Sequence, residues 1–413
     1  MRVLVLDGNQ NQAVASVRSL ARAGHEVWVG ESTSWSKAGW SRSCTRSFEY
    51  PAPQRHADEF IARLIDLAST SRGTLILPMT EATTLPISVN REKLAAAGAR
   101  FVLPDHTELL RAFDKQETTK LAASLGIAVP KTITVASTEP SRDVVQSLSF
   151  PVVLKPRASE ELSSSGTVRT AGRPRYASNP QQFDAAYQDL QSRCSTILIQ
   201  EFVAGEGTGY FALMQHGELR AEFAHQRIRD VYPTGSGSAL RVSIAPDPVI
   251  RNASLAMLRA LRWHGVAMVE FRKKDGEAPV FMEVNGRFWN SLPLARYAGV
   301  DFPALLARMA ETGDVPLSLG YRTGIRCRWL LGDFRHLVEV WMGPPPGYPE
   351  PYPNRLRALL TILTPVPGTY HDLFQASDPL PELGDWLSFA QRIFKRQAMR
   401  HPTQQLSEGK PHA

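Results

Sequence analysis

Residues 266–272, VAMVEFR, and 280–287, VFMEVNGR, decide the fold of this chain. The link between them contains Asp275-Gly276, a dipeptide that is typical of a type I′ turn. We therefore predict that the two runs are antiparallel strands of one hairpin. If these two residues form the turn, Glu270 faces Phe281 on the opposite strand.

Two carboxylates and one amide then share a face of this hairpin. Glu283 becomes the diagonal neighbour of Glu270, with Cβ atoms roughly 7–8 Å apart or less. Asn285 points to the same side because side chains alternate along a strand. Such oxygen ligands suit Mg²⁺ when phosphate oxygens complete its shell, so we predict a metal site at Glu270, Glu283 and Asn285. In the alternative interpretation, the carboxylates lie on a solvated face and pair with Arg272 or Arg287.

The first hundred residues alternate strand and helix patterns. Short apolar runs predict buried strands of a parallel sheet, and apolar residues at helical spacing predict the helices between them. This order indicates a doubly wound α/β unit over residues 1–104. The strands are expected at 2–6, 25–29, 74–77 and 100–103, and the helices around 14–21 and 60–68, with Gly24 ending the first helix.

The first turn of this unit argues against a dinucleotide-binding enzyme. The run 7–12, DGNQNQ, has one glycine where the NAD fingerprint requires three. Ligands of open α/β sheets nevertheless lie beyond the carboxyl ends of the strands. Thr80 and Glu81 follow the third strand and are candidate substrate contacts. Equally, Thr80 could cap a helix that has Glu81 in its first turn.

Two lysines in the middle of the chain are candidates for phosphate binding. We expect a helix from about Thr107 to Leu125 that carries Lys115, although a helix lysine is usually a solvated surface residue. The strand 150–156 ends in Lys155, and an ammonium in this apolar context needs a partner such as a phosphate oxygen. The hydroxyl-rich segment 162–167 could fold over phosphates or form a simple turn.

A further buried strand at 197–203, ILIQEFV, ends in polar residues and is followed by Gly205-Glu206-Gly207. Strand-end backbone groups beside apolar side chains are what an adenine ring requires, although this pattern is weak evidence by itself. The five segments described so far resemble the ATP-grasp superfamily over residues 1–310. The nearest resemblance is to its carbamoyl-phosphate-synthase-like and carboxylate–amine-ligase-like members, which share HGVAMVEF at 264–271 and FWNSL at 288–292.

The resemblance implies a fold and a role for each candidate residue. It implies a doubly wound domain at 1–104, a two-subdomain ATP-grasp domain at 105–310 that holds ATP between its subdomains, and a C-terminal extension at 311–413. Nucleotide contacts would come from Lys115, Lys155, Gln200, Glu201, Phe202, Val203 and Glu206, with Glu206 reaching the ribose. Glu270, Glu283 and Asn285 would hold Mg²⁺, with Mn²⁺ as a substitute, and Arg287 would stabilise the transferring phosphoryl group.

The implied reaction is the activation of a small-molecule carboxylate as an acyl phosphate, followed by attack of an amine. Phosphoryl transfer depends on positioning and charge neutralisation, which lysines, an arginine and metal ligands provide. Arg227 and Arg241 are candidate clamps for the carboxylate, or else partners of surface acids. The alternatives are a catalytically silent ATP-binding regulator or assembly factor, and an enzyme that forms carbamoyl phosphate.

Two features depart from the family pattern. Relatives commonly carry proline where this chain has Gly286, which predicts a looser turn between Asn285 and Arg287. The expected phosphate loop at 162–167 is rich in serine rather than glycine. Neither departure removes a metal ligand or a phosphate-binding lysine, so we expect a working enzyme.

Composition excludes several other classes of protein. The net charge of +7 is spread along the 413 residues rather than massed in one block, so we expect no nucleic-acid partner. No apolar stretch or leader pattern indicates a membrane span or a signal peptide. The cysteines, Cys44, Cys194 and Cys327, are too widely spaced for a zinc site or a disulfide framework, which favours the cytoplasm.

Beyond residue 311 the sequence becomes turn-rich and then amphipathic. The run 343–349, GPPPGYP, predicts a stiff connector. An apolar stripe that includes Trp386, Phe389 and Ile393 predicts a helix with basic residues around it. Such a stripe could lie on a membrane, but it more often packs on its own domain or on a second subunit, so a homodimer is one expectation. Residues 401–413 are polar, and we expect them to be disordered.

Overall fold

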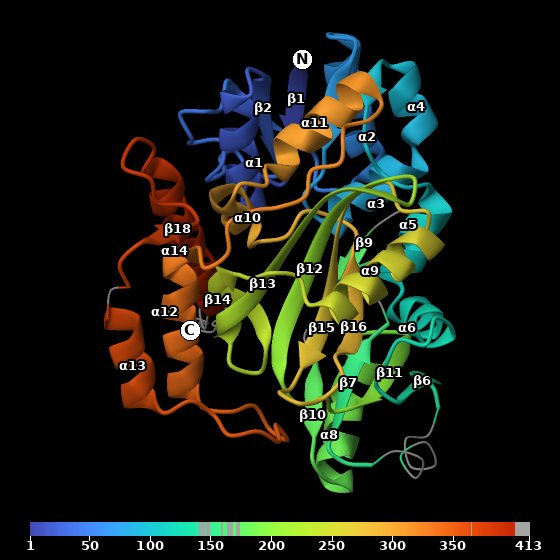
Figure 1. Ribbon diagram of the computed structural model, residues 1–413, viewed down its shortest axis with the longest axis vertical. Coiled ribbons are helices and arrows are strands. Elements are labelled where there is room, and N and C mark those ends of the chain that lie inside the picture. The colour runs from blue at the N-terminus through green and yellow to red at the C-terminus, as the bar shows by residue number, and fades with distance from the viewer. Residues whose placement is uncertain are drawn as a thin grey trace, which may run out of the picture.

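The computed structural model describes residues 1–139, 145, 149–157, 160–162, 168–170, 174–364 and 366–400 (Figure 1). The expectations for residues 401–413 and for the core of the hydroxyl-rich segment, 163–167, fall outside the described residues. In Figure 1 the N-terminal unit lies at the top, a small sheet with α8 lies at the bottom, and the C-terminal helices lie along the left side.

The N-terminal unit is a parallel sheet with helices, as the alternating pattern predicted. Its strand order is β3-β2-β1-β4-β5, which is the order of a doubly wound sheet. Gly24 follows the first helix with φ +86°, a conformation that glycine adopts readily. The sequence interpretation missed β3, and the strand expected at 100–103 is shorter and earlier. The elements are β1 (Arg2–Val5), α1 (Asn11–Arg22), β2 (Glu26–Glu31), β3 (Arg46–Glu49), α2 (Ala57–Ser69), β4 (Thr74–Leu77), α3 (Glu81–Val89), α4 (Arg91–Ala96) and β5 (Ala99–Arg100).

The helix expected from Thr107 to Leu125 is two helices, α5 (His106–Phe113) and α6 (Lys115–Ser124). Asp114 separates them with extended backbone angles, and its carboxylate accepts hydrogen bonds from the backbone N–H groups of Gln116 and Glu117. A side chain that caps a new helix competes with continuation of the old one, which explains the break. Because of this break, Lys115 is the first residue of α6 rather than part of a long solvated face.

A small antiparallel sheet, which we call the lid, follows these helices. Its strand order is β10-β7-β11-β6, and α8 packs on one face through Phe183, Tyr187 and Leu190. The separate β8–β9 ladder lies between β7 and β10 in sequence. The bounds are β6 (Thr132–Ala136), β7 (Val152–Pro156), β8 (Glu160–Leu162), β9 (Val168–Thr170), β10 (Arg175–Ala177), α8 (Pro180–Gln191) and β11 (Thr196–Glu201).

A seven-stranded sheet forms the centre of the molecule, with strand order β16-β15-β12-β13-β14-β17-β18. The last two strands come from beyond residue 310, so the expected boundary of the C-terminal extension falls inside this sheet. Apolar clusters cover both of its faces. The bounds are β12 (Glu206–Gln215), β13 (Glu218–Tyr232), β14 (Ser236–Ser243), α9 (Pro248–Ala260), β15 (Gly265–Lys273), β16 (Val280–Asn285), α10 (Leu292–Ala298), α11 (Phe302–Thr312), β17 (Arg326–Arg328) and β18 (Thr369–His371).

The C-terminal helices are α12 (Leu330–Met342), α13 (Arg355–Leu363) and α14 (Leu380–Arg400). The aromatic stripe of α14 packs within the chain, because the rings of Trp386 and Phe389 contact Phe334 of α12 at centroid distances of 5.5 and 5.9 Å. Within the described residues, no helix combines the length and the apolar character that a bilayer crossing requires.

Candidate nucleotide and metal site

The hairpin β15–β16 places the two carboxylates closer than the sequence predicted. Glu270 pairs directly with Glu283, and the register shifts between Glu270 and Phe271, where a β-bulge adds one residue to β16. The prediction that Glu270 faces Phe281 is therefore wrong. Asp275 does not have the positive φ of a type I′ turn, and only Gly276 does, at +78°. The longer link and the bulge together explain the changed register.

A cavity of about 140 Å³ lies between the lid and the central sheet. It brings together residues from α6, from β7 and β11 of the lid, from the hinge that follows β11, and from the β15–β16 hairpin. Segments that are far apart in sequence thus meet at one site. The candidate residues that line it are Lys115, Lys155, Gln200, Glu201, Phe202, Val203, Glu270 and Glu283.

Lys155 is the unsatisfied cation of this cavity. Its ammonium has no hydrogen bond or ion pair within the part of the chain that the structure describes, and α6 brings a second lysine, Lys115, toward it. Burial and the charge of Lys115 lower the pKa of Lys155 to about 8, against the opposing effect of Glu283. A cation in this setting would be stabilised by an anionic ligand.

Glu283 is held by two neighbours that keep it charged. The Lys115 ammonium lies 3.8 Å from its Oε2 atom, and the Asn285 amide donates to Oε1 at 3.0 Å. Burial would raise the pKa of Glu283, but Lys115 and the Asn285 amide outweigh it, so the pKa is lower than usual. Glu283 is therefore a ready anionic ligand for a divalent cation.

Glu270 is paired with Arg227 of β13 at 2.8 Å, not with Arg272 as the alternative interpretation allowed. Arg227 also lies 3.6 Å from Asp230 and donates to the Gly235 carbonyl at 3.2 Å. Its guanidinium thus lies against the Glu270 side of the β15–β16 hairpin, although Arg227 comes from another strand of the sheet. Among the described residues, no group of three or more His, Cys, Asp or Glu side chains could hold a metal alone. A cation at Glu270 and Glu283 would need further oxygen ligands, as phosphates provide.

The hinge leaves the backbone of Val203 available. Gln200 donates to the Thr132 hydroxyl at 3.0 Å, and Glu201 accepts from the backbone N–H of Ser149 at 3.2 Å, so both side chains hold the lid together. Phe202 donates its backbone N–H to the Pro151 carbonyl. Within the described residues, Val203 makes no backbone hydrogen bond, and its N–H and C=O are free for the edge of an adenine.

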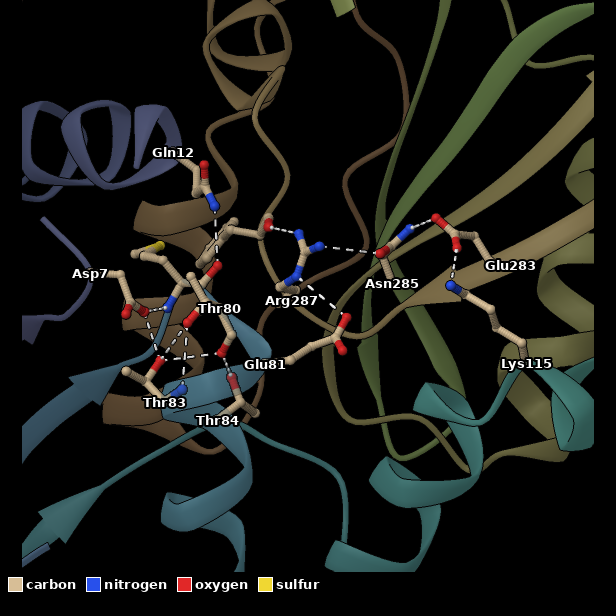
Figure 2. A network of polar contacts seen from close by, with 12 residues as sticks. Asp7, Gln12, Thr80, Glu81, Thr83, Thr84, Lys115, Glu283, Asn285 and Arg287 are labelled. Atoms are coloured by element: carbon tan, nitrogen blue, oxygen red, sulfur yellow. Dashed lines mark hydrogen bonds and ion pairs between the residues drawn. The ribbon is translucent and has the colours of Figure 1, made fainter. Parts of the chain in front are cut away.

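Arg287 joins the site to the N-terminal unit (Figure 2). Its Nε atom lies 3.8 Å from Glu81 at the start of α3, and its Nη2 atom donates to the Asn285 amide oxygen at 3.4 Å. The Thr80 hydroxyl accepts from the Thr83 backbone N–H, which is the capping role that the sequence offered as an alternative. Burial raises the pKa of Glu81, which the charges of Arg287 and Lys115 oppose.

Gly286, before Arg287, has a packing role. A Cβ atom at this position would lie 2.4 Å from the ring of Trp263, so glycine permits a close contact between this backbone and a buried aromatic side chain. The structure thus gives a packing reason for the departure from the family's proline.

Sequence reasoning missed Asp7, a buried carboxylate at the carboxyl end of β1. It accepts hydrogen bonds from the Thr83 hydroxyl at 2.6 Å and from the Met79 backbone N–H at 2.9 Å. In Figure 2 it lies at the left, with Thr80 and Thr83 between it and Glu81. Burial raises the pKa of Asp7 to about 6. The available signal was its position after the first strand of an open α/β sheet.

Two predicted site residues lie elsewhere. On β12, Gly209 pairs with Glu270, and Glu206 lies three positions before it. Because side chains alternate along a strand, the Glu206 side chain points to the opposite face of the sheet. There its carboxylate accepts a hydrogen bond from the Gln226 amide at 2.6 Å. Arg241 has no exposed surface and forms a buried ion pair with Asp372. We therefore do not retain Glu206 as a ribose contact or Arg241 as a substrate clamp.

Comparisons with known proteins agree with this geometry. The biotin carboxylase domain of Hydrogenobacter thermophilus 2-oxoglutarate carboxylase, solved with MgADP, ADP and bicarbonate, matches 79% of this chain and 73% of that chain, with a TM-score of 0.62 and 14% identity. D-alanine–D-alanine ligase of Nitrosomonas europaea is 26% identical over 220 residues, which are 48% of this chain and 67% of the ligase. The carbamoyl phosphate synthase large chain of Methanosarcina mazei is 24% identical over 197 residues, 45% of this chain but only 17% of that protein.

The fold and the arrangement of the candidate site resemble those of ATP-grasp proteins. The class that these matches indicate is an ATP-dependent ligase. More particularly, residues 193–332 match the model of a family described as ATP-grasp in the biosynthetic pathway with Ter operon. This match covers the hinge, the hairpin with its carboxylates, and Arg287.

Proposed function

We propose that this protein is an ATP- and Mg²⁺-dependent ligase that activates a small-molecule carboxylate as an acyl phosphate for attack by an amine. The observation that carries the proposal is the Lys155 ammonium, which has no hydrogen bond or ion pair to the described residues, beside the opposed carboxylates of Glu270 and Glu283 in one cavity. A triphosphate would supply negative charge for the lysine, and its bound divalent cation would take the carboxylate oxygens as ligands.

Each side chain has a role in this proposal. Val203 would bind the adenine edge through its free backbone groups, and Lys115 and Lys155 would bind phosphate oxygens. Mg²⁺, or Mn²⁺ in its place, would neutralise charge on the phosphates when held by Glu270, Glu283 and Asn285. Arg287 would stabilise the phosphoryl group in transfer, because it lies beside Asn285 and contacts Glu81 of the N-terminal unit.

The substrate carboxylate would approach from the side of Arg287 and Glu81. Its oxygen attacks the γ-phosphorus, the bond to ADP breaks, and the acyl phosphate forms. The amine then attacks the acyl carbon and phosphate leaves. Positioning and charge neutralisation carry such a reaction, so no nucleophilic side chain is required.

The relatives support this assignment more than its alternatives. D-alanine–D-alanine ligase bears the name of a carboxylate–amine ligase, and the alignment with it spans two thirds of that protein. An enzyme that forms carbamoyl phosphate is less well supported, because the alignment with the synthase covers only 17% of it. A silent nucleotide-binding regulator would have no need for Arg287 beside the metal ligands. We retain small molecules as the partners and the cytoplasm as the expected compartment, in line with the free cysteines.

The deciding experiment is release of ADP from MgATP across a panel of carboxylates and amines, with AMP measured in parallel. ADP formed only with one carboxylate–amine pair would support the ligase and identify its substrates together. AMP formation would contradict the acyl-phosphate mechanism, because it indicates adenylation. Binding of MgATP without turnover of any pair would favour the regulator.

A further inference from the structure

The connector after α12 reaches the lid. We call residues 343–349, GPPPGYP, the strap. The Ser178 hydroxyl, just after β10, donates to the Gly347 carbonyl at 2.8 Å. Gly347 has φ +74°, and a Cβ atom there would lie 2.3 Å from the Tyr176 carbonyl oxygen. The strap therefore lies against the backbone of β10 at a distance that only glycine permits.

Tyr348 of the strap completes a cluster of three aromatic rings. Its ring centroid lies 5.1 Å from that of Tyr176 and 6.0 Å from that of Phe202, edge to face in both cases. Tyr176 and Phe202 also contact each other at 6.3 Å. These two rings line the candidate nucleotide cavity, one from the lid and one from the hinge, whereas Tyr348 supports them from outside it.

The same tyrosine is connected to the central sheet. Its hydroxyl donates to the Pro233 carbonyl at 3.4 Å, in the turn between β13 and β14. The guanidinium of Arg272 on β15 lies beside this turn. It donates hydrogen bonds to the backbone carbonyls of Gly205 and Thr234 at 3.0 Å each. The lid, the hinge and the central sheet thus meet around Tyr348, although it comes from beyond residue 310.

The other end of the strap is anchored. It continues from α12, whose Asp333 carboxylate is buried and paired with Arg229 and Arg328 of the central sheet at 2.5 Å each. A segment that is fixed at α12 and packed on β10 restricts how far the lid can move from the sheet. Restricting this motion before a ligand arrives lowers the conformational entropy lost on binding.

We propose that Tyr348 is a positioning residue of the nucleotide cavity, through which the C-terminal part of the chain holds Tyr176 and Phe202 in place for the adenine. This inference rests on the proposed function in one respect, that the cavity binds MgATP. It adds that residues beyond the superfamily resemblance, which ends at 310, determine nucleotide affinity. Tyr348 touches no reacting group, so its effect falls on binding and not on the chemical step.

The test is the dissociation constant of MgATP, measured by titration calorimetry on the full chain. We expect Tyr348→Ala to weaken binding roughly tenfold, because two edge-to-face contacts that hold the cavity walls are lost. Tyr348→Phe retains both ring contacts and should bind within about twofold of the wild type. Leu356→Ala is the control, since this side chain lies at the start of α13, just beyond the connector, and is 64% exposed.

A second variant tests the same inference by moving the strap instead of removing the tyrosine. Gly347→Ala keeps the tyrosine but forces the strap away from the Tyr176 carbonyl, so it should weaken MgATP binding as Tyr348→Ala does. With a turnover assay, both variants should raise KM for ATP and leave kcat unchanged.

The outcomes separate this inference from the proposed function. Absence of MgATP binding by the wild-type chain would contradict the proposed function. Binding by the wild type with an unchanged dissociation constant in Tyr348→Ala and Gly347→Ala would overturn the inference alone. Equal weakening by Tyr348→Ala and Leu356→Ala would also overturn it, because it would indicate a general loosening of the C-terminal part of the chain.

Discussion

Glu270 and Glu283 stand directly opposite each other on β15 and β16, and each carboxylate has its own cationic neighbour. Arg227 pairs with Glu270 at 2.8 Å, and Lys115 lies 3.8 Å from Glu283. Two carboxylates side by side would repel each other if they were alone. Arg227 offsets this repulsion at Glu270, and Lys115 helps to lower the pKa of Glu283. The pair is therefore placed to receive a divalent cation that arrives with a nucleotide.

Glu283→Ala should abolish ATP turnover and leave the fold intact. The substitution removes a metal ligand, and we expect ADP release to fall by roughly a hundredfold or more. Its side chain is 32% exposed and that of its partner Lys115 is 18% exposed, so the fold loses no fully buried ion pair. Glu277→Ala is the control, because this glutamate is 59% exposed and pairs with Lys274 near the hairpin turn, away from the cavity. Normal turnover, or an unfolded variant by circular dichroism, would count against the metal site.

Lys155→Ala should weaken MgATP binding more than tenfold, about 1.4 kcal/mol. The ammonium has no other partner among the described residues, so its contribution to phosphate binding is not shared within the protein. Calorimetry measures this effect without a known substrate. Lys120→Ala, at an exposed position on α6, should bind as the wild type does. A dissociation constant that does not change in Lys155→Ala would remove this lysine from the site.

MgATP affinity should depend on pH through the same lysine. Its pKa of about 8 in the free protein lies below the usual 10.5, because burial and Lys115 disfavour the charged form. Only the protonated form attracts phosphate, so affinity should be constant below about pH 7 and should decline as the pH rises through about 8. Lys155→Arg keeps its charge and should lack this decline. A flat wild-type profile from about pH 7 to about pH 9.5 would contradict the assignment.

Arg287→Ala should separate binding from chemistry. Its guanidinium lies between Asn285, a proposed metal ligand, and Glu81 of the N-terminal unit. There it could stabilise charge that develops in the transition state. We expect ADP release to fall by about a hundredfold to a thousandfold while the dissociation constant of MgATP changes little. ADP release and the dissociation constant of MgATP should be measured on the same preparation of the variant. A matching loss of nucleotide affinity would place Arg287 among the phosphate ligands instead.

Arg241→Ala should destabilise the fold rather than alter substrate binding. It leaves Asp372 buried without its partner, which should cost about 3–5 kcal/mol in the free energy of unfolding. The double variant Arg241→Met with Asp372→Leu removes both charges and should recover most of that loss. Urea denaturation measures both changes. An unchanged free energy of unfolding in Arg241→Ala would contradict a stabilising role for this ion pair.

Local patterns predicted much of the fold because they depend on near neighbours in the chain. Alternation of buried strands and helices predicted the parallel sheet at the N-terminus, and Gly24 marked the end of α1. The helix break at Asp114 was missed because capping and helix continuation differ by only about 1 kcal/mol. A pattern of apolar residues that runs through such a position does not reveal whether the helix continues or a new helix begins.

By itself, the sequence indicated the resemblance to the ATP-grasp superfamily, the strands that carry Lys155, Glu270 and Glu283, and the hinge at 200–203. These follow from residue types at short spacing, which local backbone preferences and strand periodicity govern. Only the tertiary structure decided that Glu270 faces Glu283, that Arg227 pairs with it, that Arg241 is buried against Asp372, and that Tyr348 supports the cavity. These contacts join segments that are distant in the chain, and their energies depend on a bulge, a buried charge or a glycine contact that no local pattern encodes.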